Sequence, residues 1–492
     1  MIKLPNECFF IIFNNFQDDF KSLYSCLLVN RDWCRIIVKI LSSEISRKLN
    51  NRKLINTCLL TLNKEEQALL IPFKIFLPNC PKPLFNYTSY TTHVDSNLDY
   101  GIIDWLNYNS YEKVDVWTYD SDYLVSAIKC SLIAMFLRTN KRLKCLEIFT
   151  FMFNDKLIKN IRRNNTVTSL FLYKNLVVLE ILCKNTTLTS LNLCGNNIGI
   201  KGGKLLAKAL CINTTLTSLT INYDSIGVEG VKALANALCK NTGLTSLNLN
   251  NNSIGIQGVN AFTDALYINT TLTSLDLSYN KIGAKSLAKA LHINTTLISL
   301  NLSYNYIGVE GAKALANALC NNVVLVFLSL NSTNISIEGI LVTLAETLCK
   351  NTTLNSLNIC SNSIDIEGIR ALINALHINT TLTSLDFSFN NIGIEEGKAL
   401  AEILCKNTTL TSLKLSGNYI GIEGGKKFAE VLCINTTLMC LDLSFNQIAS
   451  KGICALVEAV QKNITLVSLE LYGNQINDEI ENILKNINCI CH

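Results

Sequence analysis

Hydrophobic positions in the C-terminal two-thirds of the chain alternate between two spacings. In the first clear unit, Leu191 and Leu193 alternate with polar residues, which predicts a short strand with one buried face. Leu206 and Leu210 then follow at a spacing of four, which predicts an amphipathic helix. Asn196 stands between them, where its amide can bond backbone groups that the turn leaves unpaired. Each unit is therefore a strand, a turn and a helix.

The end of each predicted helix carries a recurrent Asn. Asn213 is expected to close its helix in the left-handed conformation, and Thr214 and Thr215 favour the return to strand. The resulting Asn-Thr-Thr triplets are formal glycosylation acceptors, but with no secretory signal we interpret them as helix-to-strand turns. They begin at Asn185, Asn213, Asn269, Asn294, Asn351, Asn379, Asn407 and Asn435.

The unit repeats along the chain with the frame L-x-x-L-x-L-x-x-N-x-I-x-x-x-G-x-x-x-L-x-x-x-L. Eight of the ten steps between clear units are 28 residues, and two weaker units precede them at Leu143 and Val167. One such unit cannot bury its apolar face alone, so we expect the units to stack into a curved α/β solenoid with a parallel inner sheet and outer helices. The clear units begin at Leu188, Leu216, Leu244, Leu272, Leu297, Leu325, Leu354, Leu382, Leu410, Leu438 and Leu466.

This frame resembles the ribonuclease-inhibitor class of leucine-rich repeats. The 28-residue period and the G-x-x-x-L-x-x-x-L helix carry the resemblance, which covers residues 141–492. The resemblance implies a horseshoe of eleven clear and about thirteen total repeats. Two units depart from the frame: the unit at Leu272 is short and lacks the Gly, and the unit at Leu325 has Thr333 in place of Asn.

Residues 1–43 show a different pattern, which predicts three short helices. Apolar residues recur on one side of each helix, and Asp18 or Asp19 and then Asn30 can cap the second and third. A segment this short cannot bury all of those side chains alone, so we expect a surface for an obligate partner.

The run Leu4-Pro5-x-Glu7, with the apolar positions that follow and the segment ending Asn30-Arg31-x-Trp33, resembles the F-box motif. That resemblance implies an all-α motif that docks on a Skp-type adaptor and, through it, joins a cullin ubiquitin ligase. Position by position, it assigns an adaptor-binding role to Leu4, Pro5, Ile12, Phe16, Leu23, Leu28, Val29 and Trp33. An N-terminal helical cap on the repeats is the alternative interpretation.

Residues 44–140 are predicted to be a partly helical connecting region. Four of the five prolines fall between Pro72 and Pro83, which marks an irregular connection. Helical patches are expected near residues 45–70 and 121–138.

Composition limits the class of protein, the cellular compartment and the kinds of partner that we expect. Hydrophobic residues make up 49% and charged residues 16%, which excludes disorder as the dominant state, and the longest apolar runs are too short for a membrane span. With no signal peptide, we expect an intracellular protein, cytoplasmic or nuclear. The net charge of +5 comes from residues 1–165, and we interpret this basic excess as a solvated face, with no nucleic-acid and no membrane partner.

Seven of the 20 cysteines occupy one position of the repeat, near the end of the helix. Equivalent positions on adjacent helices lie roughly 8–10 Å apart, too far for a disulfide. We therefore expect small buried hydrophobic residues in a reducing compartment. They are Cys183, Cys211, Cys239, Cys320, Cys349, Cys405 and Cys433.

Few residues suggest catalysis or the binding of a metal or cofactor. His292 and His377 fill the cysteine position and are interpreted as packing residues, and the C-terminal Cys489-x-Cys491-His492 supplies at most three ligands. The Gly-rich segments lack the spacing of a phosphate loop. No nucleophile–base pair stands out, so we expect a protein that is not an enzyme and has no cofactor and no metal.

The inner sheet is the predicted target-binding surface. Its outward positions combine acidic, polar and aromatic side chains, a composition that suits a protein interface, although the aromatic residues have an alternative role as padding at the end of each strand. The candidate residues are Tyr223, Asp276, Tyr279, Asn301, Tyr304, Asp386, Phe389, Lys414, Asp442, Phe445 and Glu470.

Three functions fit these observations. The first is the substrate receptor of a cullin–RING (SCF-type) ubiquitin ligase, with the unknown target protein on the inner sheet. The second is a stand-alone leucine-rich repeat scaffold or inhibitor-like binder. The third is a GTPase-activating protein, disfavoured because Arg370 is the only Arg after Arg163 and the frame places it on a helix.

Overall fold

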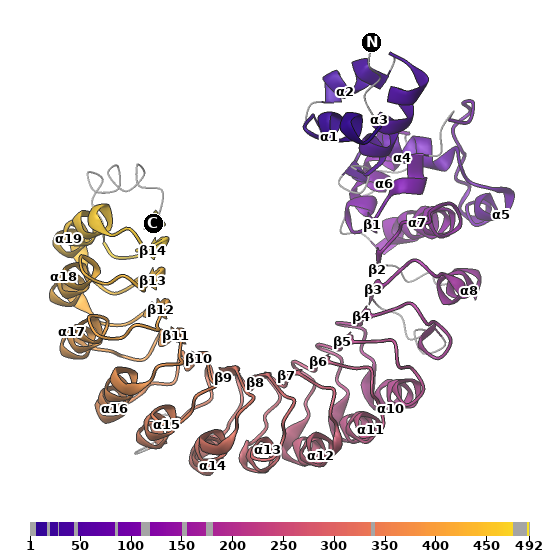
Figure 1. Cartoon of the computed structure of the whole chain (residues 1–492). Coiled ribbons are helices and arrows are strands. Elements are labelled where there is room, and N and C mark those ends of the chain that lie inside the picture. Colours follow the sequence, from indigo (N-terminus) through magenta and orange to yellow (C-terminus); the bar gives the residue numbers. More distant parts are fainter. Residues whose placement is uncertain are drawn as a thin grey trace. The chain divides into compact units, whose positions relative to one another are not determined.

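The computed structural model describes residues 6–16, 20–27, 29–43, 48–83, 87–109, 119–149, 155–173, 181–335, 340–475 and 490–491. They fall into two compact units, each drawn in Figure 1. Unit 1 contains residues 1–198 and 208–221, and unit 2 contains residues 199–207 and 222–492.

Unit 1 begins with the three helices that the hydrophobic pattern predicts: α1 (Asn6–Asn14), α2 (Phe20–Leu27) and α3 (Arg31–Ser43). They share a small core to which Phe13, Leu23 and Ile37 contribute fully buried side chains. Asn30 caps α3 as predicted, because its Oδ1 accepts a hydrogen bond from the backbone N of Trp33 at 2.9 Å. Asp18 and Asp19 lie outside the described residues.

The predicted connecting region is largely folded. It contains α4 (Arg52–Leu59), α5 (Lys64–Gln67), the 3₁₀ turns η2 (Ile71–Phe73) and η3 (Tyr87–Tyr90), strand β1 (His93–Val94), α6 (Asn97–Tyr108) and α7 (Tyr119–Thr139). Strand β1 pairs in parallel with β2, so the sheet of unit 1 begins before residue 141.

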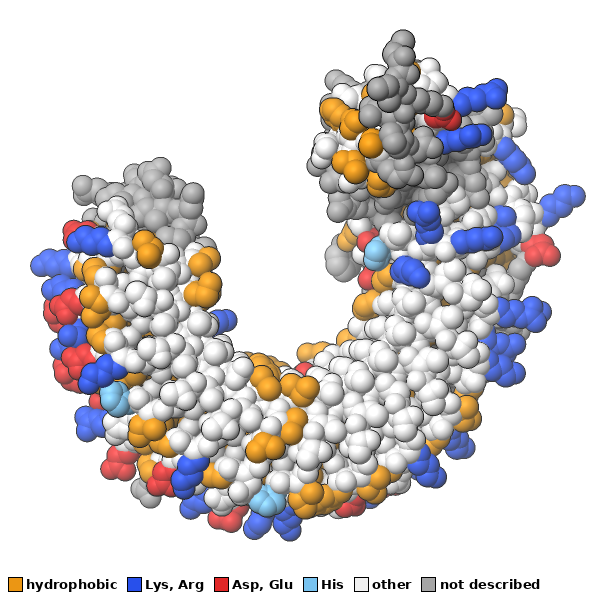
Figure 2. Space-filling model, viewed as in Figure 1, with side chains coloured by type: hydrophobic (Ala, Val, Ile, Leu, Met, Phe, Trp, Pro, Cys, Tyr) orange, Lys and Arg blue, Asp and Glu red, His pale blue; other side chains and the backbone are white. Residues whose placement is uncertain are grey.

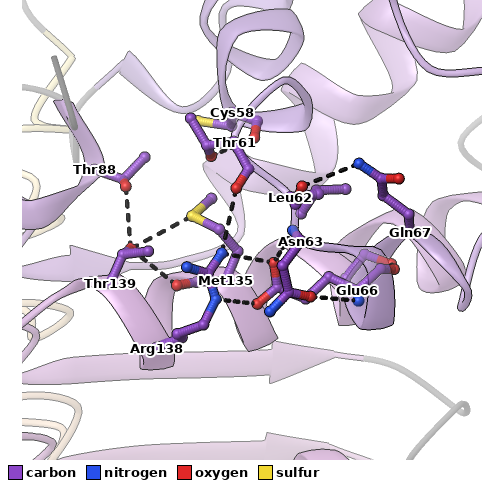
Figure 3. Close-up of polar contacts among 11 residues, drawn as sticks. Cys58, Thr61, Leu62, Asn63, Glu66, Gln67, Thr88, Met135, Arg138 and Thr139 are labelled. Atoms are coloured by element: carbon purple, nitrogen blue, oxygen red, sulfur yellow. Dashed lines mark hydrogen bonds and ion pairs between the residues drawn. The ribbon is translucent and has the colours of Figure 1, made fainter. Parts of the chain in front are cut away.

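Two ion pairs, each with one buried member, hold these helices together. Glu66 on α5 is 3% exposed and accepts from Arg138 of α7 through both carboxylate oxygens, at 2.7 and 2.8 Å (Figure 3). The same carboxylate completes a capping box with Asn63, which the close-up also shows. On the next pair of helices, the fully buried Lys129 of α7 meets Asp99 of α6 at 2.7 Å. Because each buried charge has its partner, each pair holds two helices in one orientation.

The remaining elements of unit 1 open the repeats. They are β2 (Cys145–Phe149), α8 (Asp155–Arg163), β3 (Ser169–Tyr173), β4 (Ser190–Asn192) and β5 (Ser218–Thr220), with α10 (Gly199–Leu210) divided between the two units. Strands β1 to β5 pair in parallel in chain order. Strands β2 and β3 lie in the segments where the two weaker repeats are predicted, at Leu143 and Val167.

Unit 2 is a leucine-rich repeat solenoid with parallel strands on its inner side and helices on its outer side (Figure 1). Each three-residue strand buries its central residue against the helices, as Leu247 does in β6; the residues on either side are more exposed, except Ser329 of β9, which is also buried. Neighbouring strands pair with equivalent residues opposite one another from β6 to β14. The strands are β6 (Ser246–Asn248), β7 (Ser274–Asp276), β8 (Ser299–Asn301), β9 (Phe327–Ser329), β10 (Ser356–Asn358), β11 (Ser384–Asp386), β12 (Ser412–Lys414), β13 (Cys440–Asp442), β14 (Ser468–Glu470) and β15 (Ile490–Cys491).

The outer helices of unit 2 bury Leu and Ala on one side. The helices are α11 (Gly227–Leu238), α12 (Gly255–Ile268), α13 (Lys285–Leu291), α14 (Gly308–Asn321), α15 (Ile340–Leu348), α16 (Ile366–Ile378), α17 (Ile394–Ile403), α18 (Gly421–Leu432) and α19 (Ala449–Lys462). The short helix α13 belongs to the repeat at Leu272, which the sequence frame identified as short.

A ladder of buried asparagines follows the strands and confirms the role predicted for Asn196. Asn280 is typical: its Oδ1 accepts a hydrogen bond from the backbone N of Asn252, its counterpart in the preceding repeat, at 2.7 Å. Its Nδ2 donates to the carbonyls of Leu249 and Leu277 at 2.8 and 3.1 Å. Each asparagine thus satisfies backbone groups of two repeats.

A second ladder lies where each helix returns to strand, and here one prediction was wrong. Asn213 does not adopt a left-handed conformation, and the equivalent Asn269 is extended, with φ −72° and ψ 128°. The side chain acts instead: Asn269 accepts from the backbone N of Leu272 at 2.7 Å and donates to the carbonyls of Leu238 and Asn241. These turns are therefore closed by side-chain hydrogen bonds between repeats.

The expectation that the repeated cysteines are buried was also wrong. Cys183, Cys211, Cys349, Cys405 and Cys433 are exposed, and Cys239 and Cys320 are half-buried. The exposed ones stand just past the last helical residue, where the side chain faces solvent rather than the neighbouring helix, as at the C-cap Cys433. All seven are free thiols. Among the described helices, none combines the length and apolar composition needed to cross a bilayer.

Candidate protein-binding surface

The outward column on the strands of unit 2 contains six of the predicted target-binding residues. Asp276, Asn301, Asp386, Lys414, Asp442 and Glu470 lie at the last position of their strands. In the register, Lys414 stands between Asp386 and Asp442, and Asp442 is beside Glu470. Like charges in neighbouring positions repel, so the pair at this end of the sheet is suited to a cationic partner group.

Most of these carboxylates and amides also shape the turn that follows. The Oδ1 atoms of Asp276, Asp386 and Asp442 each accept a hydrogen bond from the backbone N two residues later, at 2.9, 3.1 and 2.9 Å. Asn301 does the same at 3.0 Å. These bonds fix the orientation of the side chains, which lowers the conformational entropy lost when a partner contacts them.

The aromatic candidates form a second column, three residues beyond the end of each strand. All five adopt left-handed backbone conformations: Tyr223 (φ 60°), Tyr279 (57°), Tyr304 (56°), Phe389 (54°) and Phe445 (52°). For bulky residues this conformation is an outlier that costs roughly 1–2 kcal/mol per residue. The rings are nevertheless 43–59% exposed. Such strained, half-exposed aromatic side chains are typical of functional surfaces.

The rings pack along the column. Tyr279 and Tyr304 stack with centroids 4.0 Å apart and an interplanar angle of 12°. Desolvation, followed by the hydrogen bond with Tyr304, raises the pKa of Tyr279 to about 12. Phe389 lies over Gly417 of the next repeat, where an added Cβ would be 2.3 Å from the ring. The column therefore presents flat apolar surfaces in fixed positions.

Tyr472 is a contributor that the sequence frame missed. It is 62% exposed, and its ring meets that of Phe445 edge-on, with centroids 5.2 Å apart. Tyr472 occupies a position that holds a small, mostly polar residue in the other clear repeats, so the repeat frame did not predict an aromatic residue there. The following Gly473 is the one local feature that could have suggested a bulky neighbour.

Charge is unevenly distributed on unit 2. In Figure 2 the charged side chains gather on the outer, helical side, whereas the inner side is mostly uncharged. Arg370 follows this pattern: it lies on α16, as predicted, and its Nη2 is 3.3 Å from Glu396. The inner surface thus combines aromatic rings and small polar groups with the charged side chains that end β7, β11, β12, β13 and β14, a composition that suits a protein interface.

The predicted adaptor-binding residues of unit 1 divide into three groups. Ile12, Phe16 and Val29 are exposed, at 43%, 42% and 58%. Leu23 is buried in the helical core, and Trp33 packs beside it, with its ring 4.9 Å from that of Phe13. Leu4, Pro5 and Leu28 lie outside the described residues.

The comparisons with known proteins agree with this fold. The family model described as Leucine Rich repeat matches residues 184–207, 269–289, 294–316, 350–372, 379–401, 406–429, 435–457 and 462–480. These segments are therefore leucine-rich repeats, which stack into a scaffold with an extended concave surface suited to binding a protein. No curated protein matches.

Two solved structures resemble parts of the chain. One is the leiomodin-1 actin-binding site 2, at 22% identity and a TM-score of 0.26, covering 28% of this chain and 79% of that one. The other is an internalin (inlF) from Listeria monocytogenes, at 20% identity and a TM-score of 0.36, covering 73% of this chain and 78% of that one.

Proposed function

We propose that this chain is the substrate-recognition subunit of a cullin–RING (SCF-type) ubiquitin ligase. The observation that carries the proposal is the three-helix motif of residues 6–43, which has the F-box-like sequence and leaves apolar side chains exposed beside its own core. In this role the chain performs no chemistry, because it accelerates ubiquitin transfer only by holding the target near the ligase.

The adaptor side rests on Ile12, Phe16 and Val29. A motif this small that exposes three large apolar side chains presents an apolar surface for a partner rather than for solvent. Side chains of this kind anchor interfaces between helices. Leu23 and Trp33 stabilise the motif that carries these side chains by packing in its core. The Skp-type adaptor is the partner that the F-box resemblance implies.

The target side rests on the two columns of unit 2. The aromatic column supplies large rigid contact surfaces, and the oriented carboxylates and amides beside it supply hydrogen bonds. The target protein would lie across several repeats, with Phe389 and Phe445 among its anchors.

A pull-down tests the adaptor side. The full chain with Ile12→Glu and Val29→Glu should lose a purified Skp-type adaptor, while the wild type retains it. Ile71→Glu is the matched control, because Ile71 is 71% exposed and lies outside the motif. If the wild type binds no adaptor, the proposal is wrong and a stand-alone repeat binder is favoured. If the double variant still binds, these residues are not the interface.

A second comparison tests the target side. Proteins captured by the full chain but lost from Phe389→Ala with Phe445→Ala would identify target candidates. Ubiquitination of such a protein by the reconstituted ligase should require both rings. Unchanged ubiquitination by the double variant would remove the aromatic column from target binding.

A further inference from the structure

The turns from helix to strand in unit 2 form one continuous edge of the solenoid, here called the turn edge. It comprises residues 239–245, 267–273, 292–298, 320–326, 349–355, 377–383, 405–411, 433–439 and 461–467. The asparagine ladder stacks each turn on the one before: Asn407, for example, donates to the carbonyls of Leu376 and Asn379, at 2.8 and 3.5 Å. Residues 28 apart in sequence thus become neighbours.

The turn edge has an unusual composition. None of its nine segments contains Asp or Glu. The residue before the ladder asparagine is Lys or Ile in every turn but one. The lysines are Lys240, Lys350, Lys406 and Lys462, and the isoleucines are Ile268, Ile293, Ile378 and Ile434.

The isoleucines are unusually exposed for their type. Their exposed fractions are 59–66%, and Val323 and Ile464 in the same turns reach 70% and 95%. Repeated exposure of large apolar side chains along one edge marks an interaction surface rather than a solvated face.

The lysines on this edge differ from those on the helices. Lys232, Lys398 and Lys426 each meet a Glu three residues away at 2.8–2.9 Å, which neutralises them locally. Among the described residues, no salt bridge joins any of the four turn-edge lysines to an acidic group. The edge therefore offers uncompensated positive charge together with exposed apolar side chains.

The geometry of the edge favours a flat partner. In Figure 1 the helices of unit 2 are seen nearly along their axes, so the turns that follow them face one common direction. A flat surface can then contact many turns at once. An anionic phospholipid bilayer matches both chemistries, because its phosphates attract Lys and its headgroup–acyl boundary accepts apolar side chains. Nucleic acid would use the lysines but gives no role to the isoleucines.

We propose that the turn edge docks unit 2 on an anionic lipid bilayer, with the isoleucines entering the headgroup boundary and the lysines contacting lipid phosphates. Attachment is peripheral, because it needs no membrane-crossing helix. The sequence alone predicts no membrane partner, since the single Lys and Ile residues are far apart until the repeats stack. This inference is independent of the ligase function.

Vesicle co-sedimentation with the full chain tests the proposal. The vesicles contain phosphatidylcholine alone or phosphatidylcholine with about 30% phosphatidylserine. The apolar variant is Ile268→Ser, Ile378→Ser and Ile434→Ser, and its matched control is Ile256→Ser, Ile366→Ser and Ile394→Ser. The control isoleucines are also 43–64% exposed but stand in the first turns of their helices, away from the turn edge. The charge variant is Lys240→Gln, Lys350→Gln and Lys406→Gln, with Lys232→Gln, Lys398→Gln and Lys426→Gln as control.

We expect binding to the phosphatidylserine vesicles that weakens with added salt. Each turn-edge variant should lower the apparent affinity about tenfold or more, and each control should leave it unchanged. Absence of wild-type binding to these vesicles overturns the proposal. So does equal loss in the apolar variant and its control. Salt-sensitive retention of double-stranded DNA without vesicle binding would instead identify the lysines as a nucleic-acid surface and also overturn it.

Discussion

Gly417 offers a direct test of how the aromatic column is built. It stands in the position that holds Phe389 and Phe445 in the neighbouring repeats, and its φ is +67°. An added Cβ would lie 2.3, 2.4 and 2.8 Å from three atoms of the Phe389 ring. Gly417→Ala therefore introduces two separate costs: a left-handed backbone for a residue with a Cβ, and displacement of the ring.

The two costs have different sizes. The left-handed conformation costs Ala roughly 1 kcal/mol relative to Gly. The ring of Phe389 is 52% exposed, so swinging it into solvent exposes the other half of its surface. Half of about 200 Å² at about 25 cal/mol per Å² gives about 2.5 kcal/mol, an upper estimate because the unfolded chain also buries some apolar area. Gly417→Ala should thus destabilise the protein by about 3 kcal/mol.

A double-mutant cycle separates the costs. In the background Phe389→Ala the ring is already absent, so Gly417→Ala should cost only about 1 kcal/mol, which leaves a coupling energy of about 2 kcal/mol. Urea unfolding of the four proteins, followed by circular dichroism, measures this coupling from the midpoints and slopes. If the two substitutions are additive within about 0.5 kcal/mol, the ring does not rest on Gly417 and the reasoning is refuted.

Three further predictions follow from other parts of the structure. Asn418→Ala removes a buried amide that bonds backbone groups on two repeats, and urea unfolding should show a loss of about 3 kcal/mol, whereas a loss under about 1 kcal/mol would contradict the ladder. The pKa of Tyr279 in the folded state is about 12, above its ordinary value of 10.0. The contribution of Tyr279 to stability is therefore present below pH 10 and is lost as the pH rises towards 12. Tyr304→Phe should lower the pH at which Tyr279 ionises, as measured by absorbance at alkaline pH. In the native protein a water-soluble thiol reagent should modify Cys433 promptly but spare Cys58, whose burial raises its pKa to about 12, and equal rates would contradict this placement.

The repeat fold could be predicted from the sequence because its period is carried by residues with single roles. Leu191 and its equivalents are buried in each strand from β2 to β14, and the asparagines bond the backbone of the neighbouring repeat. The frame even tolerates a substitution: Thr333 replaces Asn, yet its Oγ1 still donates to the carbonyl of Leu330 and bonds Asn362. Residue spacing was therefore sufficient to predict the fold at each position of the repeat that has the same surroundings in every unit.

The parts that the sequence did not predict depend on contacts between distant segments. Strand β1 has two residues, and no periodicity can distinguish His93–Val94 from a loop; only pairing with β2 defines it. Glu66 and Arg138 are 72 residues apart, so their ion pair has no sequence signal. The burial of the repeated cysteines was predicted wrongly because spacing locates a residue near a helix end but does not determine which way its side chain points.

The strained column shows where the sequence departs from what the fold alone requires. The position needs φ near +55°, which Gly, Asn and Ser fill elsewhere in unit 2, at Gly473, Asn251 and Ser361. Tyr and Phe fill it in five repeats although each costs roughly 1 kcal/mol or more in backbone strain. Packing offsets that strain within the chain, between the stacked rings of Tyr279 and Tyr304 and where Phe389 lies over Gly417, but the rings remain half exposed. Large apolar rings left half exposed at strained backbone positions are suited to contacts outside the chain, which agrees with the proposal of a target protein on this column.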